Sequence, residues 1–295
     1  MKNLPVAGLV YCTLVWGSTF IVVKDALSSV HPAAMVGWRF AMAAVVLLVL
    51  PSVRRGLRLH LRESAVLSVW LCLLYLAQTW GLQYTSASNS GFITGLFVFF
   101  VPLIMLFFLR RSFGLFQWFC AALAVAGLWV LSGGPSGFNR GDALTLLTAL
   151  AYAAHVVLAD RYVRAGMDIP VLVFHQFWMT AVFSFALAGV CGLPLAVADA
   201  KGWWIMAFLA FVPTLSGFFV QLWAQKFVPP LQTALIFSLE PVFAALFAWT
   251  LGGELFTAQK GFGGLMMLAA AVASEAARVR AEQVPRTAEQ APDAR

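Results

Sequence analysis

The 295-residue chain is 62% hydrophobic and 11% charged, and its mean hydropathy is +0.88. Soluble domains carry about 25% charged residues, so this composition excludes a soluble globule and is typical of a helical membrane protein. The net charge of +7 is distributed over short segments between apolar runs, which argues against a nucleic-acid partner and for contact with membrane lipid.

Ten apolar runs are close to the length of about 20 residues that a helix needs to cross a bilayer. The predicted fold class is therefore all-α integral membrane with ten transmembrane helices, and the polar tail 277–295 is predicted to be a disordered cytoplasmic segment. We predict the spans at residues 6–24, 33–51, 65–83, 88–109, 114–132, 142–159, 170–191, 203–226, 231–251 and 257–275.

Lysine and arginine residues predict the orientation, because cytoplasmic loops are enriched in them. With a cytoplasmic N-terminus, fourteen of the nineteen lie on the cytoplasmic side and Arg39 lies inside a span. Only Lys24, Arg140, Lys201 and Lys260 lie on the outer side. We therefore expect both termini to be cytoplasmic.

An internal echo divides the chain into two halves. Residues 78–102, QTWGLQYTSASNSGFITGLFVFFVP, return in a shorter form at 221–241, QLWAQKFVPPLQTALIFSLEP. Division at the glycine-rich linker leaves five spans in each half, 1–135 and 136–276. Because five is odd, the second half enters the membrane from the opposite face, and the two halves are predicted to be inverted repeats.

Inverted repeats are typical of transporters, in which both halves build one site near the membrane midplane. Gln78 and Gln221 correspond in the two copies and lie within apolar spans, so we expect them to face a substrate path. The alternative, that they join neighbouring helices by hydrogen bonds, stays open.

Small residues and prolines mark the fourth and ninth spans. The spacing of Gly91 and Gly95 predicts close packing of two helix backbones. Pro102 and Pro241 each remove a helix hydrogen bond, so we predict kinks there, which serve either as hinges or as static shape.

Ionisable side chains inside the predicted spans are functional candidates by default. Glu240 is the clear acid, and it serves as a coupling site, as the partner of a substrate amine or as a structural carboxylate. Arg39 either has a functional role or lies close enough to the membrane surface for its guanidinium group to reach water, that is, to snorkel. His155 either binds a ligand or is a satisfied core histidine.

The sequence lacks the patterns of several chemical classes. HExxH, GxSxG and Walker motifs are absent, so we predict neither an enzyme nor an ATP-driven pump. The four cysteines are single and lie in apolar segments, which predicts buried small hydrophobes rather than disulfides or metal ligands. We expect no metal and no cofactor. A non-transporting role, as a lipid-modifying enzyme or an assembly partner, is the alternative from another class.

Three stretches resemble the drug/metabolite transporter superfamily of the EamA type. They are LVWGSTFIVVKDAL with the following WRF, LQYTSASNSGFITGLFVFFVPL, and PLQTALIFSLEPVFAALFAWTLGGELFTAQKGFGG. The last is the most specific, because an E-P pair followed by GGE and a glycine-rich final span is characteristic of that family. The resemblance covers residues 6–275, and within the superfamily the chain is similar to the YddG-like branch of aromatic amino-acid exporters.

The resemblance implies export of small metabolites, with aromatic or neutral amino acids as the expected substrates, across the inner (plasma) membrane of a bacterium by alternating access. Multidrug or other metabolite efflux by the same fold is the alternative. Nothing in the sequence decides the oligomeric state, and a monomer is compatible with it. Carried onto this chain, the family places the substrate path at Trp16, Thr19, Tyr75, Gln78, Thr94, Phe97, His155, Gln221 and Phe237.

Overall fold

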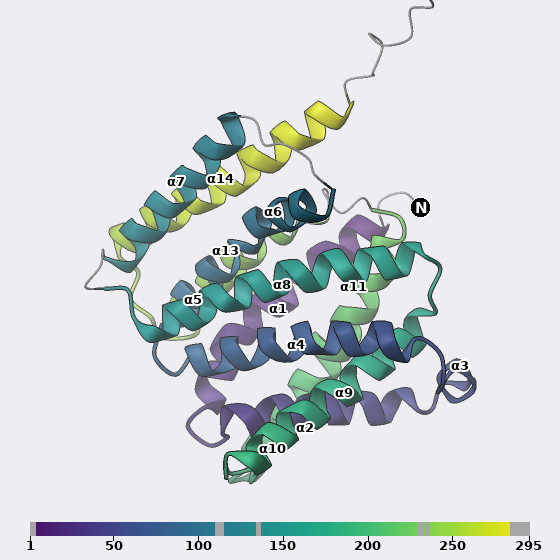
Figure 1. Ribbon diagram of the computed structural model, residues 1–295. Helices are drawn as coiled ribbons and strands as arrows, with labels where there is room; N and C mark the ends of the chain where they lie inside the picture. The colour runs from purple at the N-terminus through teal and green to yellow at the C-terminus, as the bar shows by residue number, and fades with distance from the viewer. Residues whose placement is uncertain (1–3, 110–114, 134–136, 229–232, 234–235, 284–295) are drawn as a thin grey trace, which may run out of the picture.

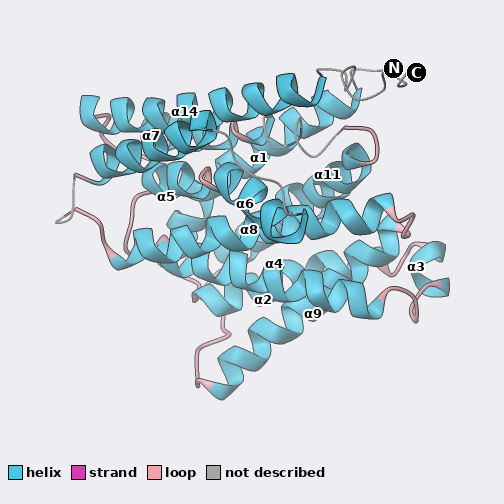
Figure 2. Ribbon diagram, turned by 45° about the horizontal axis from the view of Figure 1, so that its top comes forward, coloured by secondary structure: helices cyan, strands magenta, loops and turns pink. Residues whose placement is uncertain are grey.

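Helices form nearly all of the computed structural model, which describes residues 4–109, 115–133, 137–228, 233 and 236–283 (Figures 1 and 2). The first half contains α1 (Leu4–Ala26), α2 (Pro32–Leu47), α3 (Pro51–Arg55), α4 (Leu61–Gly81), α5 (Ala87–Thr94), α6 (Phe97–Leu109) and α7 (Leu115–Ser132). The second half contains α8 (Arg140–Arg164), α9 (Ile169–Val190), α10 (Ala200–Leu209), the π-helix η1 (Ala210–Ser216), α11 (Gly217–Gln225), α13 (Glu240–Thr250) and α14 (Ala258–Gln283).

Polar side chains begin several of these helices, because the first backbone N–H groups of a helix have no partner inside it. Asn139 and Asp142 form a reciprocal capping box at the start of α8. Asp168 accepts from the amide of Val171 at the start of α9, and Asp199 accepts from the amide of Gly202 in α10. These caps fix where the chain turns between helices.

Seven predicted spans appear as single helices with ends shifted by a few residues. The fourth span is two helices, because turns at Gly95 and Leu96 separate α5 from α6. The eighth contains a π-helix, and α13 of the ninth begins at Glu240. Residues 229–232 and 234–235, in and before the predicted ninth span, lie outside the described residues.

The predicted kink at Pro241 was wrong, because Pro241 begins a helix and does not interrupt one; a kink at Pro102 stays a prediction. Pro241 lies in the first turn of α13, where the missing N–H costs nothing, and turns at Ser238 and Leu239 precede it. Pro102 lies within α6, beyond the break at Gly95. The prediction of disorder from residue 277 was also wrong for the described part, because α14 continues to Gln283; residues 284–295 lie outside the description.

The surface of the bundle is apolar over long stretches. In the described part of the chain, six helical segments are long and apolar enough to cross a membrane, and two shorter apolar helices, Pro32–Leu47 and Trp118–Leu131, accompany them. Large apolar side chains project outward, including Leu115 at 90% and Val190 at 87% exposure. Such a surface suits lipid and not water, so the chain is an all-α, multi-pass membrane protein.

Helices of one half pack mainly on helices of the other. The extensive pairs are α7 with α14, α4 with α8, α2 with α9, α1 with α13 and α11, and α5 with α13. Both views show α7 and α14 on one side of the bundle and α2 with α9 on the opposite side (Figures 1 and 2). The remaining helices therefore enclose the centre.

Glycines bring α5 and α13 close together at this centre. A Cβ atom added to Gly91 would lie 2.5 Å from the Cβ of Ala244, and one added to Gly95 would lie 2.5 Å from Cγ of Pro241. The predicted close packing of these glycines is confirmed.

Candidate functional site

A small cavity lies where helices of the two halves meet. Its volume is about 30 Å³, enough for a water molecule but not for an organic solute. The site is therefore closed in this conformation. The lining residues are Trp16, Thr19, Leu74, Tyr75, Gln78, Thr94, Tyr152, His155, Phe218 and Glu240.

Six aromatic rings form a cage around this cavity, three from each half of the chain. Trp16 lies 5.6 Å from Phe218 and 5.3 Å from Phe237 between ring centroids. Tyr152 stacks on Phe97 at 4.5 Å. Edge and stacked contacts of this kind stabilise the packing beyond the area that the rings bury. The sixth ring is Tyr75, which lies 6.3 Å from Phe218.

The π-helix η1 positions Trp16 in the cage. In an α-helix the amide of Gly217 would bond to the carbonyl of Pro213, but here it donates to the carbonyls of Val212 and Thr214. The freed carbonyl of Pro213 accepts from Nε1 of Trp16 at 2.8 Å. The local sequence, with a proline inside the span, thus supplies the acceptor that holds an indole donor inside the membrane.

Glu240 lies at the start of α13 and is buried, with 5% exposure. Its Oε2 accepts from the hydroxyl of Tyr152 at 3.3 Å. The N-terminal end of a helix carries a partial positive charge, which favours a carboxylate at this position. Among the described residues it is the only acidic side chain that lines the cavity, and in its ionised form it can attract a cationic group of a ligand.

Arg39 does not snorkel, contrary to one of the two sequence interpretations. Its side chain is buried at 3% exposure, its Nε donates to Oγ1 of Thr214, and its guanidinium lies 4.5 Å from the ring centroid of Tyr75. Arg39 therefore joins α2 to η1 and to a cavity residue of α4. It does not itself line the cavity.

The structure brings together six of the nine residues predicted to line the path, namely Trp16, Thr19, Tyr75, Gln78, Thr94 and His155. Phe97 and Phe237 belong to the aromatic cage without lining the cavity, and Gln221 follows Phe218 by three residues on α11. Their role in transport stays a prediction.

The predicted path omitted Leu74, Tyr152 and Phe218, which line the cavity. Tyr152 corresponds to Trp16 when LVWG at residues 14–17 is aligned with LAYA at residues 150–153, and Phe218 corresponds to Tyr75 when the two glutamines are aligned. The repeat therefore contained the signal for both. The interpretation of every cysteine as buried was wrong for Cys191, which is exposed at the end of α9.

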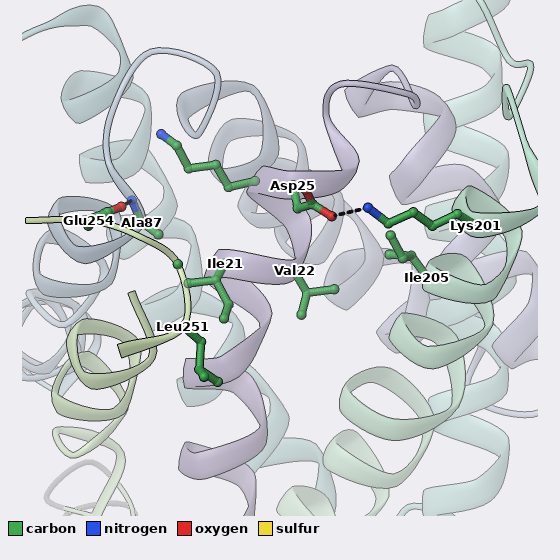
Figure 3. A pocket seen from close by; sticks show the side chains of 10 residues that line it. Ile21, Val22, Asp25, Ala87, Lys201, Ile205, Leu251 and Glu254 are labelled. Atoms are coloured by element: carbon green, nitrogen blue, oxygen red, sulfur yellow. Dashed lines mark hydrogen bonds and ion pairs between the residues drawn. The ribbon is translucent and has the colours of Figure 1, made fainter. Parts of the chain in front are cut away.

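A larger recess of about 610 Å³ lies at the end of the bundle where α1 ends and α5 begins (Figure 3). Asp25 of α1 and Lys201 of α10 face each other across it, with 2.9 Å between carboxylate and ammonium. Both side chains are more than half exposed, so this ion pair contributes little to stability. It can form and break at little cost.

Two other charged side chains of the recess hold the turn between α4 and α5. Lys24 donates to the carbonyl oxygens of Leu82 and Thr85. Glu254 accepts from the amides of Ala87, at 2.5 Å, and Ser88, at 3.3 Å, at the start of α5. A cation at the end of one helix and an anion at the start of the next both match the helix dipoles. The glutamate of the GGE sequence thus caps a helix of the other half.

An apolar helical bundle in which two related halves enclose a small cavity lined by aromatic and polar side chains is the arrangement typical of a membrane transporter. Residues 4–133 and 139–274 each match the model of the EamA-like transporter family, and the chain belongs to this family. The predicted resemblance to the drug/metabolite transporter superfamily and the prediction that the chain is not an enzyme are confirmed.

Several relatives carry names that state no substrate. An uncharacterized transporter of Archaeoglobus fulgidus is 34% identical over 90% of this chain and 83% of its own length. The uncharacterized inner membrane transporter YedA of Escherichia coli K12 is 26% identical over 85% of this chain and 84% of its own. A solved crystal structure matches with a TM-score of 0.68 over 93% of this chain and 98% of that chain; at 17% identity it shows the fold alone.

Proposed function

We propose that this protein exports small neutral or zwitterionic metabolites, with amino acids as the favoured class, across the inner membrane of a bacterium. It works as a secondary transporter or facilitator by alternating access. The observation that carries the proposal is the closed aromatic cage, to which each family-matched half contributes three rings. The relative named as an inner membrane transporter supports the location.

The architecture in this proposal is ten spans in two inverted five-helix halves, with both termini cytoplasmic. The packing of the helices supports it. A two-fold axis between the halves would relate α1 to α8 and α11 to α4, so the contact of α1 with α11 corresponds to the contact of α8 with α4. The same axis pairs α2 with α9, α5 with α13 and α7 with α14, as observed. Under this orientation the recess of Figure 3 opens to the outside.

The chemistry of the cavity favours a solute with an apolar body and an amine. The rings offer flat apolar surfaces and π-faces that attract cations, and Glu240 offers one negative charge. Thr19, Gln78 and Thr94 add hydroxyl and amide groups that can bond a carboxylate. This set matches an amino acid with an aromatic or apolar side chain.

A lipophilic organic cation is the second candidate. Glu240 is the one charged lining group among the described residues, and aromatic rings with one acid form a binding site for cations. An organic cation has no carboxylate, so its binding does not require a hydrogen-bond donor for one.

Purified protein in liposomes loaded with labelled amino acids tests the proposal. We expect efflux above that of protein-free liposomes, with aromatic and neutral amino acids moving faster than acidic ones. Parallel liposomes loaded with a labelled organic cation separate the two candidates. Flux of the cation without flux of any amino acid would contradict the proposed substrate class.

The Gln78→Ala variant is expected to reduce amino-acid flux by about 5- to 30-fold, because the loss of one hydrogen bond to a desolvated solute costs about 1–2 kcal/mol. Membrane yield should be close to that of the unmodified protein, because Gln78 has only one long contact, 3.4 Å to Thr94. Flux per milligram and yield are measured together, with the exposed Gln83→Ala variant as control. Normal flux with poor yield would instead assign Gln78 a packing role.

The Glu240→Gln variant is expected to lower flux modestly, by about fivefold for a loss of about 1 kcal/mol, because glutamine keeps an acceptor for Tyr152 but loses the charge. Flux is measured with and without an imposed pH gradient. Glu63→Gln, in the first turn of α4 and outside the cavity, is the control. Complete loss of pH dependence in Glu240→Gln alone would make Glu240 the coupling acid.

A further inference from the structure

The two copies of one polar pair differ in their hydrogen bonding. Gln78 donates to Thr94 at 3.4 Å, and both line the cavity. In the second half, Gln221 corresponds to Gln78, and Thr233 corresponds to Thr94, since each threonine stands eight residues before its proline. Gln221 and Thr233 are fully buried at 0% exposure, and none of their polar side-chain atoms has a partner among the residues described.

Two further glutamines have at least one buried amide atom without a partner among the described residues. Gln176 of α9 is fully buried; its Oε1 lies 3.0 Å from Nε2 of His155, and its Nε2 has no partner in the described part of the chain. Gln225, at the end of α11, is fully buried with both amide atoms unpartnered. Arg164, at the end of α8, donates to the backbone carbonyl of Gln225 at 3.1 Å.

The two glutamines of α11 extend from the cavity toward one end of the bundle. Phe218 lines the cavity and contacts the rings of His155, at 5.8 Å, and Phe177, at 5.6 Å. Gln221 and Gln225 follow Phe218 at spacings of three and seven residues, so they lie on the same face of α11. That face therefore continues from the cavity to the end of α8, which is cytoplasmic in the proposed orientation.

Burial without a partner is unfavourable for an amide, and packing alone would be served better by leucine or methionine. A state in which α8, α9 and α11 separate would give these groups water or a solute as partner. The mate pair Gln78 and Thr94 already lines a cavity in the present conformation. When an inverted repeat is closed on the cytoplasmic side, the pair of one copy is expected to line a cavity while the corresponding pair of the other copy is buried. This is the difference between the two copies here.

We propose that Gln176, Gln221, Gln225 and Thr233 form a second solute-binding site on the cytoplasmic side of the cavity. It takes a small neutral or zwitterionic solute, because its four side chains offer both donors and acceptors and none of them is charged. This inference rests on the proposed function, because the orientation proposed there is what places the site on the cytoplasmic side.

Thiol labelling tests the accessibility of this site without any solute. In a background without the four native cysteines, Gln225→Cys is treated in inside-out vesicles with a membrane-impermeant maleimide. Ala224→Cys is the matched control, because Ala224 is also fully buried and adjacent in α11. We expect Gln225→Cys to react at least tenfold faster, since it becomes accessible when the cytoplasmic side opens. Equal rates overturn the inference.

Replacement by leucine separates a binding role from a packing role. Gln221→Leu and Gln225→Leu are expected to keep or raise the unfolding temperature in detergent, because each removes unpartnered polar atoms. Uptake of labelled phenylalanine into inside-out vesicles should fall at least tenfold, with the exposed Gln83→Leu as control. A lower unfolding temperature, or unchanged uptake, overturns the inference. If the unmodified protein moves no amino acid, the proposed substrate class fails, and the labelling and unfolding results still decide this site.

Discussion

Replacing Gly91 with alanine is expected to destabilise the protein by roughly 1–3 kcal/mol and to reduce its yield. The added methyl group would lie 2.5 Å from the Cβ of Ala244, so α5 and α13 would have to move apart. Because these helices carry Thr94 and Glu240, the same movement would disturb the cavity. Thermal unfolding in detergent and flux in liposomes measure the two effects.

Gly189→Ala is the matched control for this substitution. Gly189 also lies within a helix, α9, and an added Cβ would meet no atom within 4 Å. Alanine at such a site should stabilise the helix by about 0.5–1 kcal/mol or leave it unchanged. Equal unfolding temperatures of the two variants would show that the approach of α5 to α13 does not limit stability.

Replacing Trp16 with alanine is expected to have the largest effect on the cage. The substitution removes ring contacts to Phe218, Phe237 and Tyr152 and leaves the carbonyl of Pro213 without its donor. Loss of a buried Trp costs about 3–5 kcal/mol, and we expect flux to fall by roughly 100-fold in protein that still folds. Unfolding temperature and flux are measured on the same preparations.

Trp16→Phe separates the ring from its hydrogen bond. This variant keeps an aromatic ring but loses the donor and part of the buried volume of the indole, so we expect a smaller destabilisation than for alanine, of about 1–3 kcal/mol. Trp204→Ala, at a residue that is 78% exposed on α10, should behave as the unmodified protein. Unchanged flux of folded Trp16→Ala would remove the aromatic cage from the substrate path.

The sequence predicted the helices well where the signal is local. Hydropathy over about 20 residues located the spans, and polar residues with prolines marked their ends. The break between α5 and α6 escaped this reasoning, because Thr94 is the only polar side chain in residues 91–109 of the sequence and Gly95 is needed for the close contact with Pro241. The position of the π-helix escaped it as well, since Trp16, distant in sequence, supplies the donor for Pro213.

The candidate site was predictable in part, through the repeat. Comparison of the two halves identified Gln78 and Gln221 as a pair, and the same alignment relates Tyr75 to Phe218 and Trp16 to Tyr152. It contained no information on hydrogen bonding. Only the structure shows that Gln78 lines the cavity while Gln221 is buried without a partner among the described residues.

The sequence by itself determined that this is a membrane protein of a duplicated transporter family, because hydropathy, repeats and motifs can be recognised in the chain without knowing which residues are in contact. The tertiary structure decided the neighbours of each buried polar group. It placed Tyr152 against Glu240, and it placed Glu254 at the start of α5. It also placed Arg39 against Thr214 and the ring of Tyr75. In a low-dielectric interior the free energy of a charge or an amide depends on its nearest partners, and those partners come from distant parts of the chain.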